Sequence, residues 1–227
     1  MTTTRKESEE KMAIKIALAG NPNCGKTTMF NALTGANQYV GNWPGVTVEK
    51  KEGKLKGKRG KGEDVIVTDL PGIYSMSPYT LEEVVSRDYV LKENPDVIID
   101  LVDATNIERN LYLTTQLVET GVPVVIALNM ADLLEKRGIK IDVKRLSMLL
   151  DCPIVETSAL KGEGLDKLID EAIKTAKKSS VDLPKEVFSK EMEAAIADVK
   201  DVLPESITED KKRWYAIKFL ENDEKVK

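Results

Sequence analysis

The sequence predicts an α/β protein: a mostly parallel sheet of about six strands with helices on both faces, followed by a small helical domain. Two observations lead to this prediction. Residues 20–27 read Gly-Asn-Pro-Asn-Cys-Gly-Lys-Thr and fit the pattern G-x-x-x-x-G-K-[ST], between an apolar run at 14–19 and a helical stretch at 28–33. Along residues 65–178, short runs that are apolar throughout alternate with amphipathic stretches. This alternation is typical of a doubly wound sheet with right-handed crossovers.

The composition narrows the classes of protein that fit. The chain has 227 residues, 32% of them charged, and a net charge of −4, so it does not favour nucleic acid as a partner. Two cysteines, Cys24 and Cys152, cannot form a disulfide framework, and the absence of histidine excludes a zinc site. No run of 18 apolar residues exists, so we expect no membrane-spanning helix in this chain. Residues 1–12 are mostly polar, and we expect a disordered N-terminal tail there.

The glycine-rich stretch at 20–27 is a phosphate-binding loop, which we call the phosphate loop. Its glycines let backbone N–H groups approach phosphate oxygens at the N-terminus of a helix, where the helix dipole favours anions. Lys26 supplies a positive charge to the phosphates, and the hydroxyl of Thr27 is a ligand for Mg²⁺. The residues expected to bind nucleotide here are Gly20, Asn21, Pro22, Asn23, Cys24, Gly25, Lys26, Thr27 and Thr28.

The next part of the chain has an irregular segment and a hairpin. Residues 35–47 carry three glycines and a proline without a strand or helix period, and we expect a long mobile loop. Residues 48–57 and 64–69 then predict a pair of strands. Seven of the twelve residues 50–61 are basic. This basic stretch fits a solvated hairpin edge best, and an anion-binding or membrane-facing patch is the alternative.

The remaining elements follow from apolar runs and helix start signals. Thr80 and Thr105 each begin a capping box, which predicts helices from there to about residues 93 and 120. Residues 179–184 break the pattern and predict a linker. We therefore expect a domain at 13–178 and a helical domain at 179–227, the latter truncated. Further strands are expected at 97–102, 122–128 and 153–156, and further helices at 132–137, 142–151, 164–178 and, with apolar residues at helical spacing, after 188.

Polar residues at the carboxyl ends of the predicted strands define a metal and γ-phosphate site. Asp69 ends the strand at 65–68 and is placed to hold Mg²⁺ through water, while the backbone N–H of Gly72 is placed to meet the γ-phosphate. Thr47 is the candidate for a second Mg²⁺ ligand, ordered only when the γ-phosphate is bound. Ligands bind at this edge of such sheets, so these residues are expected to converge there.

The motif Asn129-Met130-Ala131-Asp132 selects the base. The carboxylate of Asp132 accepts hydrogen bonds from both N1–H and the 2-amino group of guanine, a pair of donors that adenine does not present. Asn129 and Met130 share this site. Ser158, Ala159 and Leu160 complete the pocket with a backbone N–H for the guanine carbonyl oxygen. Each motif has an ordinary structural explanation by itself, such as a turn or a helix cap. The five motifs are the phosphate loop, Thr47, residues 69–72, residues 129–132 and residues 158–160, and together in this order they predict a GTP-binding protein.

These motifs carry a family resemblance. The phosphate loop and residues 40–49, 69–78 and 103–112 together resemble the cytosolic G-protein region of the FeoB family, ferrous iron transport protein B. The resemblance implies a Ras-like P-loop GTPase fold, binding of GTP, GDP and Mg²⁺, and terminal helices that favour retention of GDP. It further implies a membrane-spanning region of the same full-length protein as partner, a place at the cytoplasmic face of the cell membrane, and room for homo-oligomers of the full-length protein.

The sequence lacks the usual catalytic groups for GTP hydrolysis. Ile73 follows Gly72 and has no carboxamide to orient water, and no Arg or Lys lies between residues 36 and 46. We therefore expect slow hydrolysis, on the order of 10⁻⁴ to 10⁻² s⁻¹. The side-chain oxygen of Asn23 is the candidate ligand for K⁺ bridging the phosphates, and it resembles the asparagine of potassium-activated GTPases; the alternative is that Asn23 only shapes the loop. The catalytic candidates are Asn23, Lys26, Thr47 and Gly72.

Two other functions share these motifs. An RNA-binding or ribosome-assembly GTPase would carry them, but it should add a basic RNA-binding module, against which the acidic balance argues. A non-catalytic docking module that responds to nucleotide is the second alternative. Measuring phosphate release in a single turnover separates such a module from an enzyme.

Overall fold

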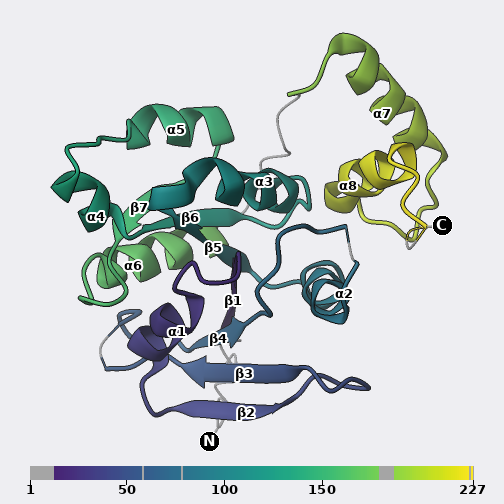
Figure 1. Ribbon diagram of the computed structural model, residues 1–227. Helices are drawn as coiled ribbons and strands as arrows, with labels where there is room; N and C mark the ends of the chain where they lie inside the picture. Colours follow the sequence, from purple (N-terminus) through teal and green to yellow (C-terminus); the bar gives the residue numbers. More distant parts are fainter. Residues whose placement is uncertain (1–12, 58, 78, 179–186, 225, 227) are drawn as a thin grey trace, which may run out of the picture.

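A seven-stranded sheet lies at the centre of the computed structural model, which describes residues 13–57, 59–77, 79–178, 187–224 and 226, apart from the side chain of residue 135. The strand order is β2-β3-β4-β1-β5-β6-β7 (Figure 1). β3 pairs antiparallel with both β2 and β4, and the other neighbours are parallel. The strands are β1 (Ile14–Gly20), β2 (Gln38–Asn42), β3 (Glu49–Lys54), β4 (Val65–Asp69), β5 (Val97–Asp103), β6 (Val124–Asn129) and β7 (Ile154–Thr157).

Helices cover both faces of this sheet, as predicted. Successive residues of a strand point to opposite faces, so Ile16 and Leu18 of β1 pack on one side while Ala17 and Ala19 pack on the other. The helices are α1 (Lys26–Thr34), α2 (Leu81–Asp88) continued by the π-helical turn η1 (Tyr89–Glu93), the 3₁₀ turn η2 (Ala104–Asn106), α3 (Ile107–Val118), α4 (Ala131–Lys136), α5 (Val143–Leu150), α6 (Leu165–Ala176), α7 (Lys190–Val202) and α8 (Glu209–Leu220).

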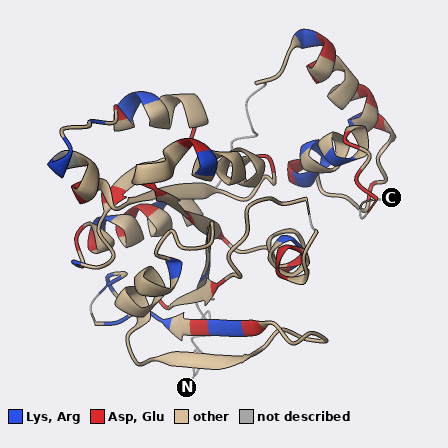
Figure 2. Ribbon diagram, viewed as in Figure 1, with Lys and Arg blue, Asp and Glu red and all other residues tan. Residues whose placement is uncertain are grey.

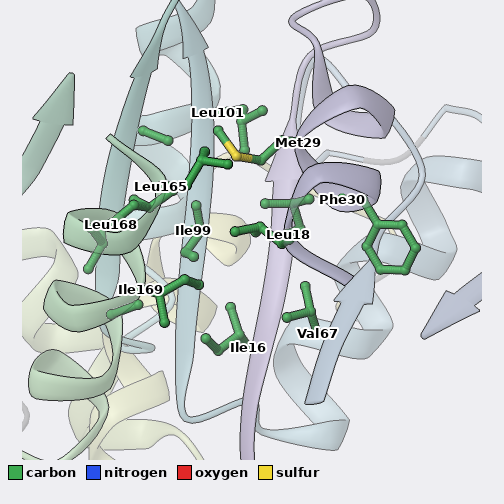
Figure 3. Packing of buried hydrophobic residues seen from close by; sticks show 14 of the residues in the cluster. Ile16, Leu18, Met29, Phe30, Val67, Ile99, Leu101, Leu165, Leu168 and Ile169 are labelled. Atoms are coloured by element: carbon green, nitrogen blue, oxygen red, sulfur yellow. The ribbon is translucent and has the colours of Figure 1, made fainter. Parts of the chain in front are cut away.

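The two cores are built by different helices. α1 and α6 contribute Met29, Phe30, Leu168 and Ile169 to the first core, where they meet the central strands (Figure 3). The second core, on the opposite face, is filled from α2, η1 and α3. Because β4, β1, β5, β6 and β7 run parallel, their carboxyl ends lie at one edge of the sheet, and the loops that follow these strands gather there.

The expectation of an irregular loop at 35–47 is wrong for part of that segment. Residues 38–42 form β2, which pairs with β3 in the register Gln38↔Gly53 to Asn42↔Glu49 and raises the strand count to seven. The sequence Gln-Tyr-Val-Gly-Asn has little apolar alternation because β2 is an edge strand with Tyr39 and Val40 exposed. Pairing with β3 makes residues 38–42 a strand, although the local sequence pattern does not indicate one.

One of the two predicted capping boxes is confirmed and the other is wrong. Thr80 accepts from the backbone N–H of Glu83, and the Glu83 carboxylate accepts from the N–H of Thr80. At the second site Asp103 caps the turn η2 through the N–H of Thr105, and α3 begins at Ile107, one residue later than a cap at Thr105 predicts. A carboxylate just before the turn accepts from the free N–H groups in place of the threonine hydroxyl.

The basic stretch at 50–61 is largely neutralised by neighbouring carboxylates (Figure 2). Lys54 pairs with Asp64, while Arg59 and Lys61 reach across to Asp166 and Asp170 of α6. β3 is not an edge, because β2 covers it. These pairs favour the solvated hairpin over an anion-binding patch. Residue 58 and the predicted linker at 179–184 lie outside the described residues.

The terminal helices α7 and α8 pack against each other through Ile196, Leu203 and Ala216. α8 also contacts the sheet domain near α2 and α3: Arg213 pairs with Glu119 at 2.6 Å, and Lys211 donates to the carbonyl of Leu91. The described part of the chain has no helix that is both long and apolar enough to cross a membrane.

Candidate nucleotide-binding site

The phosphate loop runs from the end of β1 to the start of α1 in a conformation that only glycine allows at two positions. Gly20 and Gly25 have φ of 151° and 94°. A Cβ on Gly20 would lie 2.8 Å from the carbonyl oxygen of Leu101, and one on Gly25 would lie 2.6 Å from Nδ2 of Asn129. No side chain caps the N-terminus of α1, so its first N–H groups are left for a ligand. This geometry suits an anion.

Asn23 occupies the exposed middle of this loop. It has a φ of 68°, a conformation that asparagine tolerates better than most residues. Within the described residues its side chain takes part in no hydrogen bond, which argues against a role limited to shaping the loop. Its oxygen is therefore free for a ligand, and an amide oxygen suits a hard monovalent cation. Cys24, by contrast, is buried, and desolvation raises the pKa of its thiol to about 12, so it stays protonated.

Asn129, the last residue of β6, joins two loops that lie far apart in the sequence. Its Nδ2 donates to the carbonyl of Cys24 at 2.9 Å, and its Oδ1 accepts from the N–H of Ala159 at 3.0 Å. The side chain is 2% exposed. Asn129 thus fixes the phosphate loop relative to the base loop at 158–160. Sequence reasoning assigned this residue to base selection and missed its role as a brace, which no local pattern indicates.

Asp132 stands at the start of α4 beside the base loop. Its Oδ2 lies 2.7 Å from Nζ of Lys161, and this hydrogen-bonded ion pair lowers the pKa of Asp132. The carboxylate is therefore ionised at neutral pH and able to accept from two donors of a base. Ser158 and Ala159 are buried, whereas Leu160 is 89% exposed, so its backbone is the part that can serve the pocket. Met130, between the two polar residues, has a φ of 62°.

Asp69 and Lys26 meet at the end of β4. Nζ of Lys26 lies 2.5 Å from Oδ1 of Asp69, and both side chains are about nine-tenths buried. Burial raises the pKa of Asp69, and Lys26 opposes that shift. Thr27 is exposed at the first turn of α1, and Thr28 follows it. Carboxylate and hydroxyl oxygens are the ligands that Mg²⁺ prefers, so Asp69 and Thr27 fit this cation.

Thr47 and Gly72 approach the same edge from other loops. Lys51 of β3 lies opposite Asp69 in the antiparallel register, so the segment that leads into β3, which carries Thr47, extends past the carboxyl end of β4. The Thr47 side chain is exposed, and in the described residues no hydrogen bond links it to Thr27 or Asp69. Gly72 packs on the phosphate loop, where an added Cβ would lie 3.3 Å from Cα of Pro22.

The phosphate loop is also attached to α3, a contact that sequence reasoning missed. Nδ2 of Asn21 donates to the carbonyl of Arg109 at 3.4 Å, and Asn21 is 3% exposed. The Arg109 guanidinium lies 4.4 Å from the ring centroid of Tyr74. Residues 103–112 are one of the stretches that carry the family resemblance, and this resemblance is the signal in the sequence that could have indicated the contact.

A glycine-rich phosphate loop at the carboxyl edge of a parallel sheet, joined by Asn129 to a base loop and accompanied by Asp132 and Asp69, defines a guanine nucleotide-binding protein of the P-loop class. The family model for ferrous iron transport protein B matches residues 14–172, and that for the FeoB cytosolic helical domain matches residues 188–227. The chain belongs to the FeoB family.

Individual relatives agree with this assignment. The Fe(2+) transporter FeoB of Shigella flexneri is 40% identical over 214 residues, which are 92% of this chain and 27% of the relative. The chain thus spans about a quarter of the length of the curated relatives it matches. A mutant NFeoB from S. thermophilus bound to mGDP is 52% identical with a TM-score of 0.89, covering 95% of this chain and 81% of that one. NFeoB from S. thermophilus bound to GDP.AlF4- and K+ is 53% identical, with a TM-score of 0.83 and coverages of 94% and 81%.

Proposed function

We propose that this chain binds GTP and GDP, hydrolyses GTP, and serves as the nucleotide-responsive part of a ferrous iron transporter. The observation that carries the proposal is the position of Asn129, which holds the phosphate loop and the base loop together next to Asp132. A nucleotide must contact both loops at once, and this brace presets their separation. Relatives named as Fe(2+) transporters and solved relatives bound to GDP.AlF4- support the activity and its setting.

The chain's own residues have distinct tasks in the proposed reaction. The N–H groups of the phosphate loop and Lys26 hold the phosphates, and the N–H of Gly72 meets the γ-phosphate. When nucleotide binds, the ammonium of Lys26 must leave the carboxylate of Asp69 and bind the phosphates instead. Asp69, Thr27 and Thr47 would hold Mg²⁺, which neutralises charge on the β- and γ-phosphate oxygens. A water then attacks the γ-phosphorus, the bond to the β–γ bridging oxygen breaks, and GDP and phosphate leave.

Hydrolysis is expected to be slow without an added positive charge. Ile73 is buried in the second core, so the residue after Gly72 faces away from any attacking water. Asn23 would hold K⁺, which supplies positive charge to the phosphates. Two observations support this assignment: the exposed side chain of Asn23 has no hydrogen-bond partner in the part of the chain that the structure describes, and a solved relative is bound to K+.

The proposal includes a division of the chain into two domains, a partner and a location in the cell. Residues 13–178 form the GTPase domain and residues 179–227 belong to a helical domain that favours retention of GDP. The partner is the membrane-spanning region of the same full-length protein, so the chain works at the cytoplasmic face of the cell membrane. The net charge of −4 gives no support to an RNA-bound GTPase.

Single-turnover phosphate release tests the proposal. Enzyme in excess over GTP, in K⁺ and Mg²⁺, should release one phosphate per nucleotide, whereas ATP should give no release above the protein-free blank. Binding of GTP without phosphate release would identify a nucleotide-dependent docking module instead. Equal release from GTP and ATP would contradict the assignment of Asp132.

A further inference from the structure

The helix α5 lies on the surface of the sheet domain and has one side toward the protein and one toward solvent. Val143 and Leu150 pack against the second core, and Oγ of Ser147 donates to the carbonyl of Cys152 at 2.6 Å. None of the eight residues of α5, all within the described part of the chain, is fully buried. The inward side chains hold the helix in place, so the outward ones are available for another role.

The outward face of α5 places large apolar side chains beside positive charges. Met148 and Leu149 are 61% and 68% exposed, and Lys144 and Arg145 are exposed as well. Residues four apart are neighbours on a helix, so Lys144 lies beside Met148 and Arg145 lies beside Leu149. A helix face that only contacts water is normally polar throughout. This mixed face therefore indicates a partner that has both charge and apolar material.

The end of α4 and the loop that leads into α5 have the same character. Lys136, Arg137 and Lys140 are exposed there, and Ile139 between them is 50% exposed. Figure 2 shows Lys and Arg at the end of α4 and on α5. We call this region the α4–α5 surface; it consists of Lys136, Arg137, Ile139, Lys140, Lys144, Arg145, Met148 and Leu149.

The fold leaves the positive charge of this surface without neutralising carboxylates. Residues 136–150 contain five basic residues and one acidic residue, so their net charge is +4 in a chain whose total is −4. The acidic residue, Asp142, caps α5 by accepting from the N–H of Arg145 at 2.9 Å. Among the described side chains, none of the five basic residues forms an ion pair, in contrast to Lys54, Arg59 and Lys61 of the basic stretch.

We propose that the α4–α5 surface binds the surface of an anionic phospholipid bilayer. Its five cations lie among the headgroup phosphates, and Ile139, Met148 and Leu149 enter the boundary between headgroups and acyl chains. A nucleic acid offers the same phosphates but no apolar layer, so the exposed apolar side chains favour lipid. The inference uses none of the residues assigned to nucleotide binding.

Cosedimentation with lipid vesicles tests the proposal. The chain should bind vesicles of phosphatidylcholine mixed with phosphatidylglycerol, and it should not bind vesicles of phosphatidylcholine alone. Raising NaCl from about 0.1 to about 0.5 M should weaken this binding, since salt screens exposed charges. Lys144→Gln combined with Arg145→Gln should weaken it on the order of 20-fold, from roughly fivefold for each basic side chain.

A matched control removes the same charge elsewhere. Lys174→Gln combined with Lys177→Gln changes two exposed lysines at the end of α6 and just after it, which are paired with Glu171 and Glu63. This variant has the same net charge as the α5 variant and should bind anionic vesicles as tightly as wild type. All four side chains are exposed, so both variants should fold and keep the wild-type affinity for GDP.

A fluorescent label tests whether the apolar side chains enter the bilayer. Cys24 and Cys152 are buried, so the cysteine introduced by Met148→Cys can be labelled selectively with the environment-sensitive dye NBD. Its emission should shift to the blue and gain intensity on anionic vesicles. The same label at Lys174→Cys should show no shift.

Several outcomes would overturn the proposal. Equal binding to both kinds of vesicle, or an equal loss in the α5 and α6 charge variants, would show that this surface does not select anionic lipid. Release from vesicles by millimolar inorganic phosphate would identify a site for single phosphate ions. Tighter binding to duplex RNA, with no shift of the label at residue 148 on vesicles, would assign the surface to nucleic acid. A chain that binds vesicles as expected but no nucleotide would contradict the proposed function and leave this inference intact.

Discussion

Nζ of Lys26 lies 2.5 Å from Oδ1 of Asp69, so the lysine of the phosphate loop and the carboxylate at the end of β4 neutralise each other. Both groups are largely buried, and neither would remain charged there at low cost without the other. A nucleotide with its cation offers each of them a new partner of opposite charge. When the nucleotide and its cation bind, Lys26 and Asp69 therefore lose each other as partners and gain the phosphates and the cation instead. Both side chains are already largely removed from water before this exchange.

The first prediction concerns this carboxylate. Asp69→Asn should reduce the contribution of Mg²⁺ to GDP affinity on the order of tenfold, since a charge-assisted hydrogen bond contributes about 1.5 kcal/mol or more. The measurement compares dissociation constants of fluorescent GDP with Mg²⁺ and with EDTA. Asp64→Asn, at an exposed pair with Lys54, is the control and should behave as wild type. The same Mg²⁺ effect in wild type and Asp69→Asn would contradict the assignment.

Base selection should depend on Asp132. Asp132→Asn is expected to weaken GTP binding at least about 30-fold and to improve binding of xanthine nucleotides, because an amide donates where guanine also donates. Competition of GTP and XTP against a fluorescent nucleotide measures both effects. Asp88→Asn, in an exposed pair on α2, is the control. Unchanged GTP affinity with no gain for xanthine would remove Asp132 from the base site.

Trp43 should report on the conformation of the loop that carries Thr47. It is 7% exposed, with its ring centroid 5.3 Å from that of Tyr89 and the Lys50 ammonium 5.1 Å from its ring. If residues 43–47 rearrange around the γ-phosphate, this environment must change. Fluorescence emission should therefore differ between the GDP form and the GTP-analogue form. The measurement belongs in a Trp214→Phe background, and identical spectra would mean that Trp43 takes no part in the change.

Potassium should accelerate hydrolysis through Asn23. At equal ionic strength we expect faster GTP turnover in KCl than in NaCl, and Asn23→Ala should abolish the difference while GDP still binds. Asn31→Ala, on the exposed side of α1, provides a matched control. Equal wild-type rates in both salts would rule out cation activation and favour an arginine supplied by a partner protein.

Stability should respond to the protonation of Asp100, which lies in the middle of β5. Burial raises its pKa from 3.8 to about 6, although the hydroxyl of Thr114 donates to it at 2.6 Å. The folded state then binds a proton more tightly than the unfolded state, so this carboxyl destabilises the fold above pH 6, by about 3 kcal/mol. The penalty is relieved as the pH falls from about 6 to about 4.

Asp100→Asn should therefore raise the free energy of unfolding at pH 7.5, and its advantage over wild type should shrink as the pH approaches 4. Urea denaturation at a series of pH values gives both quantities. Asp96→Asn, at the exposed residue just before β5, is the control: it removes the same charge without burial, and an amide oxygen can still accept from the N–H of Lys15. An advantage that does not vary with pH would show that Asp100 does not titrate in this range.

The sequence by itself determined the phosphate loop, the order of strands and helices, and the identity of Asp69, Asn129 and Asp132 as the polar residues at strand ends. These features are local: a glycine pattern, an apolar run and the residue that follows it carry the information. The same locality explains the errors. β2 exists because β3 pairs with it, and Asp103 rather than Thr105 acts as the cap because a 3₁₀ turn, η2, precedes α3 and begins directly after Asp103.

Only the tertiary structure decided which distant residues act together. The bonds of Asn129 to Cys24 and Ala159, the pairing of Lys161 with Asp132, and the contact between Lys218 and Ser77 each join segments that no periodicity relates. Hydrogen bonds and ion pairs of this kind require positions set to within a few tenths of an ångström. The packing of the two cores and of α8 sets these positions. They cannot be predicted from the type of a residue and its neighbours in the sequence.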